Sequence, residues 1–201
     1  MNRDVTTYTG PAIDDPEILA KLPTALVTLL EEANGFIQFK GGFHLRGACL
    51  APAWHSMRDA WIGPNAFHEL YEDVEPDDIP FAEDCLGDQF LLRKGEVWRL
   101  FCETGEMESL ELNFKKFMKE AADDPVEVLG FEPLLKFQRD GGKLEPGQLL
   151  AAWPPFCTEE AEDGVELKAV PAGERRRFLA DFAAKIRDVD DGEQIGMHVN
   201  E

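Results

Sequence analysis

The centre of the chain constrains the fold most tightly, because two apolar runs there are separated by a short turn signal. Gln89–Leu92 and Glu96–Cys102 have the length and the aliphatic and aromatic content of β-strands, and Lys94-Gly95 joins them. Glycine adopts the positive φ that a hairpin turn requires, so the pattern predicts a β-hairpin. Leu110 and Leu112 predict a third short strand, and strands connected in this way form an antiparallel sheet.

Helices are predicted before and after this segment. Asn113 is a helix-capping residue, and four apolar residues at helical spacing follow it: Phe114, Phe117, Met118 and Ala121. Upstream, Leu22-Pro23 begins a helix that ends at Asn34-Gly35, where glycine supplies a left-handed cap. Because the helices and strands are segregated, we expect the α+β class, with an antiparallel sheet and helices packed on one side.

The order of the patterns divides the chain into three parts. Residues 1–13 predict a flexible lead, residues 14–124 a core domain, and residues 125–201 a small α/β extension packed on the core. In the core we also expect strands at 36–39 and 43–45 and helices at 54–61 and 64–71. In the extension we expect helices at 131–137 and 173–188 and strands at 149–153, 165–170 and 195–199.

The chain is strongly acidic, with a net charge of −20 over 201 residues. Its hydrophobic content of 44% is ordinary for a globular protein, so the charge does not indicate disorder. An acidic surface repels nucleic acid and anionic membranes and attracts cationic proteins, so we expect no nucleic acid and no membrane as partners. Solubility alone is the other interpretation of this charge. The basic run Arg175-Arg176-Arg177 is expected on the solvent face of the last helix.

The cysteines and the apolar pattern indicate the cytoplasm. The cysteines are far apart and form no Cys-x-x-Cys pair, which predicts reduced and mostly buried thiols: Cys49, Cys85, Cys102 and Cys157. The N-terminal residues contain no apolar signal-peptide core. No apolar run approaches the length that a membrane-spanning helix needs.

No residue pattern points to a metal, a cofactor or a catalytic group. The histidines have no His or Cys companion at ligand spacing and are predicted at the surface or at helix caps: His44, His55, His68 and His198. Glu83, Asp84 and Asp88 lack the alternation of an EF-hand. No serine lies in a Gly-x-Ser-x-Gly motif, and no glycine-rich phosphate loop is present. We therefore expect no cofactor, and an enzyme is the least favoured class of function.

Between Arg58 and Arg93 the chain contains no lysine or arginine, and acids accumulate there. We predict that this stretch, with two tryptophans as anchors, forms a surface for a basic partner. The predicted partner-binding residues are Glu69, Glu72, Asp73, Glu75, Asp77, Asp78, Glu83, Asp84, Trp54 and Trp61. Two alternatives stay open: Glu83 and Asp84 can accept hydrogen bonds from turn amides, and the tryptophans can pack in the core.

Three stretches resemble the SUKH superfamily: LPTALVTLLEEANGF (22–36), IPFAEDCLGDQFLL (79–92) and EVWRLFCETGEMESLELNFKKFM (96–118). They are similar to that family in the order of their motifs: a helix from Leu-Pro to Asn-Gly, a Pro-then-acid-Gly lead into a central strand, a hairpin, a Thr-Gly-Glu turn and a Phe-x-x-Phe helix. The sequence departs from the family at Cys85 and Asp88, where members often have Gly or Asn. The C-terminal extension resembles that of some bacterial immunity proteins associated with type VI secretion.

The resemblance implies a non-enzymatic α+β binding domain. Bacterial members are commonly immunity proteins that neutralise a toxin, often a nuclease, and fungal members regulate cell-wall assembly through protein partners. For this chain it implies a cognate basic protein, a toxin, as partner, and we expect a monomer or homodimer. The alternative is a regulatory or scaffolding adaptor that binds cytoplasmic proteins without a toxin, and an enzyme or ligand-binding domain is the third hypothesis.

Overall fold

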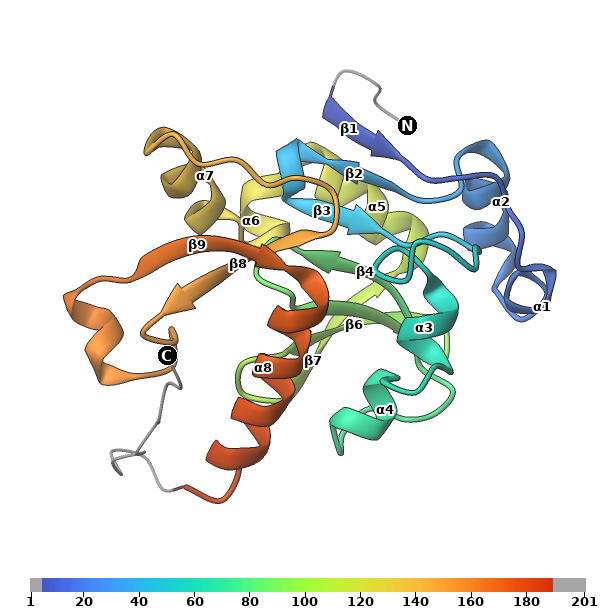
Figure 1. The fold of residues 1–201 in the computed structure, drawn as a ribbon. Coiled ribbons are helices and arrows are strands. Elements are labelled where there is room, and N and C mark those ends of the chain that lie inside the picture. Colours follow the sequence, from blue (N-terminus) through green and yellow to red (C-terminus); the bar gives the residue numbers. More distant parts are fainter. Residues whose placement is uncertain (1–4, 190–201) are drawn as a thin grey trace.

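A seven-stranded antiparallel sheet is the main element of the computed structural model, which describes residues 5–189 (Figure 1). Every strand pairs with its neighbours in the sequence, so the spatial order of the strands is their chain order. The strands are β1 (Thr6–Thr9), β2 (Phe36–Gln38), β3 (Phe43–Leu45), β4 (Ile79–Asp84), β5 (Gln89–Arg93), β6 (Glu96–Phe101) and β7 (Glu106–Asn113). The predicted α+β class with an antiparallel sheet is confirmed. The strand predicted at 195–199 lies outside the described residues.

Helices cover both faces of this sheet. The first face packs against α2 (Thr24–Glu32), α5 (Phe114–Asp123), α6 (Pro125–Leu129) and α7 (Glu132–Arg139). The second face packs against α4 (Phe67–Leu70) and α8 (Ala172–Ile186). The remaining helical segments are α1 (Pro16–Leu19), α3 (Met57–Trp61) and the 3-10 turns η2 (Phe39–Gly41) and η3 (Glu159–Asp163).

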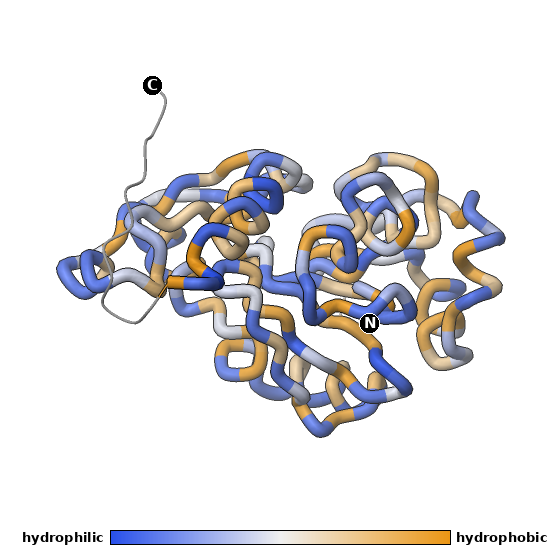
Figure 2. Tube along the Cα trace, turned by 90° about the horizontal axis from the view of Figure 1, so that it is seen from below, coloured by the Kyte–Doolittle hydropathy of each residue, from blue (hydrophilic) through white to orange (hydrophobic). Residues whose placement is uncertain are grey.

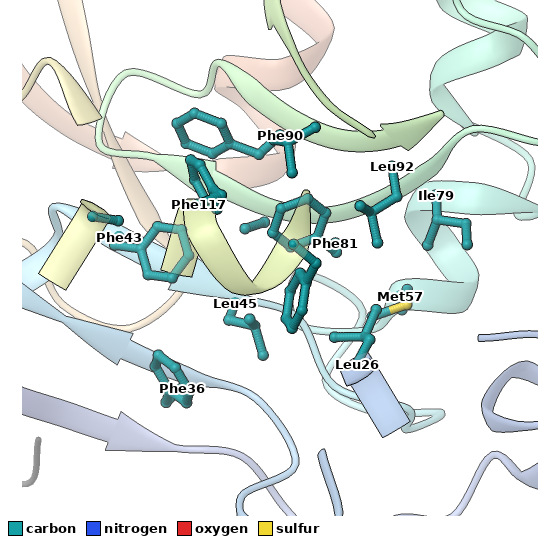
Figure 3. Packing of buried hydrophobic residues seen from close by; sticks show 14 of the residues in the cluster. Leu26, Phe36, Phe43, Leu45, Met57, Ile79, Phe81, Phe90, Leu92 and Phe117 are labelled. Atoms are coloured by element: carbon teal, nitrogen blue, oxygen red, sulfur yellow. The ribbon is translucent and has the colours of Figure 1, made fainter. Parts of the chain in front are cut away.

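Phenylalanines form the centre of the first-face core, as the helical spacing around Phe117 predicts. Phe117 of α5 lies among Phe43, Phe81 and Phe90 of the strands (Figure 3). The ring centroids of Phe117 and Phe90 are 4.8 Å apart, and both side chains are fully buried. Asn113 caps this helix by accepting a hydrogen bond from the backbone of the third helical residue, which confirms the predicted cap.

The C-terminal extension contributes α8, the longer of the two helices that cover the second face. Side chains of β5 alternate between the faces, so Phe90 and Leu92 belong to the first-face core while Leu91 lies in a cluster with Leu179 of α8. Strands β8 (Gln148–Trp153) and β9 (Glu166–Pro171) form an antiparallel ribbon beside this helix (Figure 1). The ribbon is attached to the sheet by a 2.8 Å hydrogen bond from Leu150 N–H to the Cys85 carbonyl.

The predicted flexible lead contains an ordered strand, which corrects that expectation. Thr6–Thr9 forms β1 and pairs antiparallel with β2. The sequence Thr-Thr-Tyr-Thr consists of β-branched and aromatic residues, and such residues favour a pleated edge strand.

The stretch before Gly87 is itself a central strand, although the sequence predicted only a lead into one. All six residues of β4 are buried, so the strand lacks the alternation of polar and apolar residues that sequence reasoning detects. Pro80 also argues against a strand in the sequence, because proline is rare in central strands. The register between β4 and β5 shifts between Pro80 and Ala82, and this irregularity accommodates the missing N–H.

The structure also differs from the predicted helices at two places. The helix predicted at 54–61 begins only at Met57, because the Ser56 side chain caps it by accepting a hydrogen bond from Asp59 N–H. Helix α6 was not predicted, since Asp124-Pro125 is equally typical of a helix end and of a new helix start.

Hydrophilic and hydrophobic segments alternate along the tube of the chain (Figure 2). Among residues 5–189, no helix combines the length and the apolar character that crossing a bilayer requires.

Truncation of the central phenylalanine tests this account of the core. We expect Phe117→Ala to lower the free energy of unfolding by about 3–5 kcal/mol, because it leaves a cavity among three other rings. Lys116→Ala on the exposed side of the same helix is the control and should change stability by less than about 0.5 kcal/mol. Urea unfolding measures both, and equal effects of the two variants would contradict the packing described.

Candidate functional site

The acidic loop, defined here as residues 69–78, comprises the end of α4 and the segment after it, and presents five exposed acidic side chains: Glu69, Glu72, Asp73, Glu75 and Asp77. Asp78 belongs to the predicted partner surface but is only 2% exposed. Its carboxylate accepts two hydrogen bonds from Arg93, at 2.9 and 2.6 Å. Asp78 therefore holds the loop through a buried contact, and the prediction that it contacts a partner is wrong.

Further hydrogen bonds hold the backbone of the acidic loop. Arg93 Nη2 donates to the Asp73 carbonyl at 2.5 Å, and Glu75 N–H donates to Asp78 Oδ2 at 2.7 Å. The indole N–H of Trp61 donates to the Pro76 carbonyl at 2.9 Å. Trp61 is buried, so it supports the loop from the core and does not offer a surface to a partner. The exposed carboxylates thus extend from a defined backbone.

Arginines are directed mainly to buried carboxylates. Those that form ion pairs with acids within residues 5–189 are Arg46, Arg58, Arg93, Arg99, Arg175, Arg176 and Arg187. Buried acids among their partners are Asp15, Asp78, Glu83, Asp84 and Asp88. A carboxylate away from water requires such a cation. In the described part of the chain, no lysine or arginine pairs with the exposed acids Asp73, Glu75 and Asp77.

Asp84 holds the turn between β4 and β5. Its Oδ1 accepts hydrogen bonds from the N–H groups of Leu86, Gly87 and Asp88, at 2.9 to 3.0 Å. Its Oδ2 contacts Arg99 at 2.8 Å. Burial raises the pKa of Asp84 to about 7, and the nearby Asp88 adds to this, while Arg99 opposes it. Asp84 thus accepts hydrogen bonds from turn amides, as the alternative interpretation predicts. The prediction that it contacts a partner is wrong.

Glu83 has a different role, because its side chain lies in a buried ion cluster on the second face of the sheet. It is 1% exposed and contacts Arg46 at 3.0 Å, Arg176 Nε at 2.9 Å and His44 Nδ1 at 2.8 Å. Burial alone would raise the pKa of Glu83, but Arg176, Arg46 and His44 together hold it well below its usual range. Glu83 therefore remains a carboxylate inside the protein, and its predicted contact with a partner is corrected.

Two histidines continue this cluster, although the sequence predicted them at the surface. His44 Nε2 lies 2.8 Å from His55 Nδ1, and His55 Nε2 lies 3.0 Å from the Asn34 carbonyl. The carbonyl only accepts, so His55 donates from Nε2 and, when neutral, accepts at Nδ1. His44 then donates to both His55 and Glu83 only as an imidazolium. Burial lowers the pKa of both histidines, that of His55 to about 4, and Glu83 opposes this at His44.

Helix α8 supplies a further cation to the Glu83 cluster. The expectation that Arg175-Arg176-Arg177 lies on the solvent face holds for Arg177, which is exposed, and is wrong for the other two. Arg175 is buried and donates to the Leu86 carbonyl, while Arg176 donates to Glu83 and to the Trp54 carbonyl.

A cavity of about 580 Å³ opens beside His44 and Glu83. Its walls come from β1, β2, β3 and β4, from the segment 138–149 and from Ala172 at the start of α8. Trp54 is half-buried and lines this cavity, with its ring 5.3 Å from that of His44. Of the two tryptophans predicted to contact a partner, Trp54 is thus the one with an accessible surface.

The cysteines are free thiols, as predicted: Cys49, Cys85 and Cys102 are buried and Cys157 is exposed. Residues 5–189 contain no group of three or more His, Cys, Asp or Glu side chains placed to hold a metal ion. His198 lies outside this range.

The fold has a distant counterpart among solved structures. The crystal structure of Atu4351 from Agrobacterium tumefaciens aligns with a TM-score of 0.53 and 12% sequence identity. The alignment covers 87% of this chain and 85% of that chain, so it includes the C-terminal extension as well as the sheet. At this identity the likeness concerns the fold. Neither a scan against models of protein families nor a search of the curated proteins gave a match.

Removing the charge of Glu83 tests the ion cluster. Glu83→Gln leaves Arg46 and Arg176 buried without their carboxylate, and we expect it to lower the free energy of unfolding by about 3–5 kcal/mol. Glu69→Gln is the matched surface control, with an expected change below about 0.5 kcal/mol. Chemical denaturation measures both. A loss as small as the control's would show that Glu83 does not compensate the two arginines.

The histidine pair predicts a dependence of stability on pH. Because the pKa of His55 is lowered from 6.5 to about 4 on folding, the unfolded state binds more protons between these values. Stability therefore falls as pH falls from 6.5 to 4, and His55 accounts for about 3 kcal/mol of this loss.

Denaturation midpoints measured from pH 7 to pH 4 check this contribution. His55→Gln should flatten the slope in that window relative to the unaltered protein. Identical slopes for the two proteins would contradict the assignment, whatever the absolute stability of the variant.

Proposed function

We propose that this chain is a non-enzymatic binding protein of the immunity type, which neutralises a basic toxin in the cytoplasm by direct binding. The observation that carries the proposal is the acidic loop, in which five exposed carboxylates extend from a backbone fixed by Arg93 and Trp61, and Glu72 alone among them forms an ion pair with an arginine in the described residues. The resemblance of three segments to the SUKH superfamily supports the same class of function.

Electrostatics would set the rate and the orientation of this binding. A protein that acts on nucleic acid has a cationic cleft for phosphates, and a patch of fixed carboxylates is complementary to such a cleft. Long-range attraction of this kind raises association rates by about 10- to 1,000-fold and weakens as salt is added. Because the loop is already ordered, little further conformational entropy is lost on binding.

Affinity would come from an apolar anchor beside the charges. Ile62 follows Trp61 in the chain and has 43% of its surface exposed, which is high for a large aliphatic residue. Its neighbour Trp61 contacts Pro76 of the acidic loop, and Ile62 is therefore the exposed apolar residue that we propose as the anchor. Apolar anchors surrounded by polar residues are typical of protein-binding surfaces.

Capture of the partner tests the proposal first. The purified chain serves as bait for the products of the genes adjacent to its own, each expressed separately. We expect it to retain one basic protein and to suppress the toxicity of that protein when the two are co-expressed. Retention of several proteins without toxicity would favour the adaptor alternative instead.

Charge reversal then locates the interface on the captured partner. Replacing Glu69, Asp73, Glu75 and Asp77 by Lys should slow association by about 10-fold or more at low salt and flatten its salt dependence. The control replaces Glu159, Glu160, Glu162 and Asp163 of η3, which lies away from α4 in Figure 1, and makes the same change in net charge.

Stopped-flow kinetics at several salt concentrations separates the two variants. If both slow association equally, net charge alone acts and the acidic loop is not the interface.

A further inference from the structure

The cavity beside His44 offers unused hydrogen-bond donors. Within residues 5–189, the indole N–H of Trp54, the Lys40 ammonium and the Gln138 amide group line it without a hydrogen bond or ion pair of their own. The carboxylates in its wall are already matched to cations. Glu145 pairs with Lys143 at 2.7 Å, and Glu83 lies in the arginine and histidine cluster. The free polar groups of the wall are therefore mainly donors.

Lys40 gives this wall a positive charge. Two lysines line the cavity, and Lys143 pairs with Glu145, whereas Lys40 has no ion pair in the described part of the chain. The start of α8 also reaches the cavity through Ala172, but the Ala172 N–H already donates to the Gly147 carbonyl at 2.8 Å. Lys40 is therefore the group in this wall with which a negative charge would interact.

The rest of the wall is apolar. Ile37, Leu144, Pro146 and Leu149 line it together with the Trp54 ring. A volume of about 580 Å³ is within the range of small-molecule sites, which are mostly apolar with a few polar groups that fix the ligand. An inorganic ion would leave most of this apolar surface without contact.

We propose that the cavity binds a small organic anion, with its charged group toward Lys40 and its apolar body against Trp54. A cation would meet no unmatched carboxylate there, and a neutral molecule would gain no attraction from the Lys40 charge. This site is separate from the acidic loop, so the proposal stands or falls independently of the partner-binding function.

A titration with simple probes tests it. Benzoate and phenyl phosphate have an anionic group on a flat apolar body, benzamide is the neutral counterpart of benzoate, and inorganic phosphate lacks the apolar body. The indole N–H signal of Trp54 in ¹⁵N-labelled protein, assigned by its loss in Trp54→Phe, reports binding. We expect saturable shifts with the two organic anions. Benzamide and inorganic phosphate should bind at least roughly tenfold more weakly.

A matched pair of lysine variants then locates the charge. Lys40 and Lys94 are both exposed and both have a positive φ, of 56° and 53°, which asparagine tolerates well. Lys40→Asn should weaken benzoate binding by about two- to fivefold, whereas Lys94→Asn, outside the cavity, should not. The proposal is overturned if no organic anion shifts the Trp54 signal saturably, if benzamide binds as well as benzoate, or if the two lysine variants behave alike.

Discussion

The rest of the structure depends on the buried carboxylate of Glu83. It lies on a central strand and is shared by Arg46 of the neighbouring segment, His44 of β3 and Arg176 of α8. A carboxylate buried at this depth costs several kcal/mol unless cations and donors surround it. Because one of those cations belongs to α8, the compensation is complete only when the C-terminal helix lies against the sheet. The electrostatic requirement of one residue thus fixes the helix that covers the second face and forms a wall of the cavity.

The same principle explains how an acidic chain accommodates carboxylates in its interior. Asp78 is matched by an arginine of its own, while Asp84 and Asp88 share Arg99, and all three acids shape a loop or a turn. The 40 acids of the chain outnumber its 20 bases, and the arginines used in the interior leave fewer bases to offset the acids at the surface. In residues 5–189 no lysine or arginine forms an ion pair with the exposed carboxylates of Asp73 and Glu75. Negative charge therefore collects on a loop whose backbone is held by buried contacts.

Local signals in the sequence predicted the hairpin at Lys94-Gly95 and the helix capped by Asn113, since turn chemistry and capping act over a few residues. The ion cluster could not be predicted in this way. His44 and Arg176 are separated from Glu83 by 39 and 93 residues, and no local pattern encodes such contacts. Strand β4 was missed because both of its faces are buried, so the alternation that identifies a strand is absent.

Helix α8 also connects the buried ion cluster with the acidic loop. Arg176 near its start contacts the Glu83 cluster, and Arg187 just after its end pairs with Glu72 of the acidic loop. A helix of 15 residues is roughly 22 Å long at 1.5 Å per residue. This separation exceeds the screening length of about 8 Å at physiological ionic strength, so the field of one site is weak at the other. The cations of the buried cluster at one end of this helix therefore do little to neutralise the exposed carboxylates of the acidic loop at the other end.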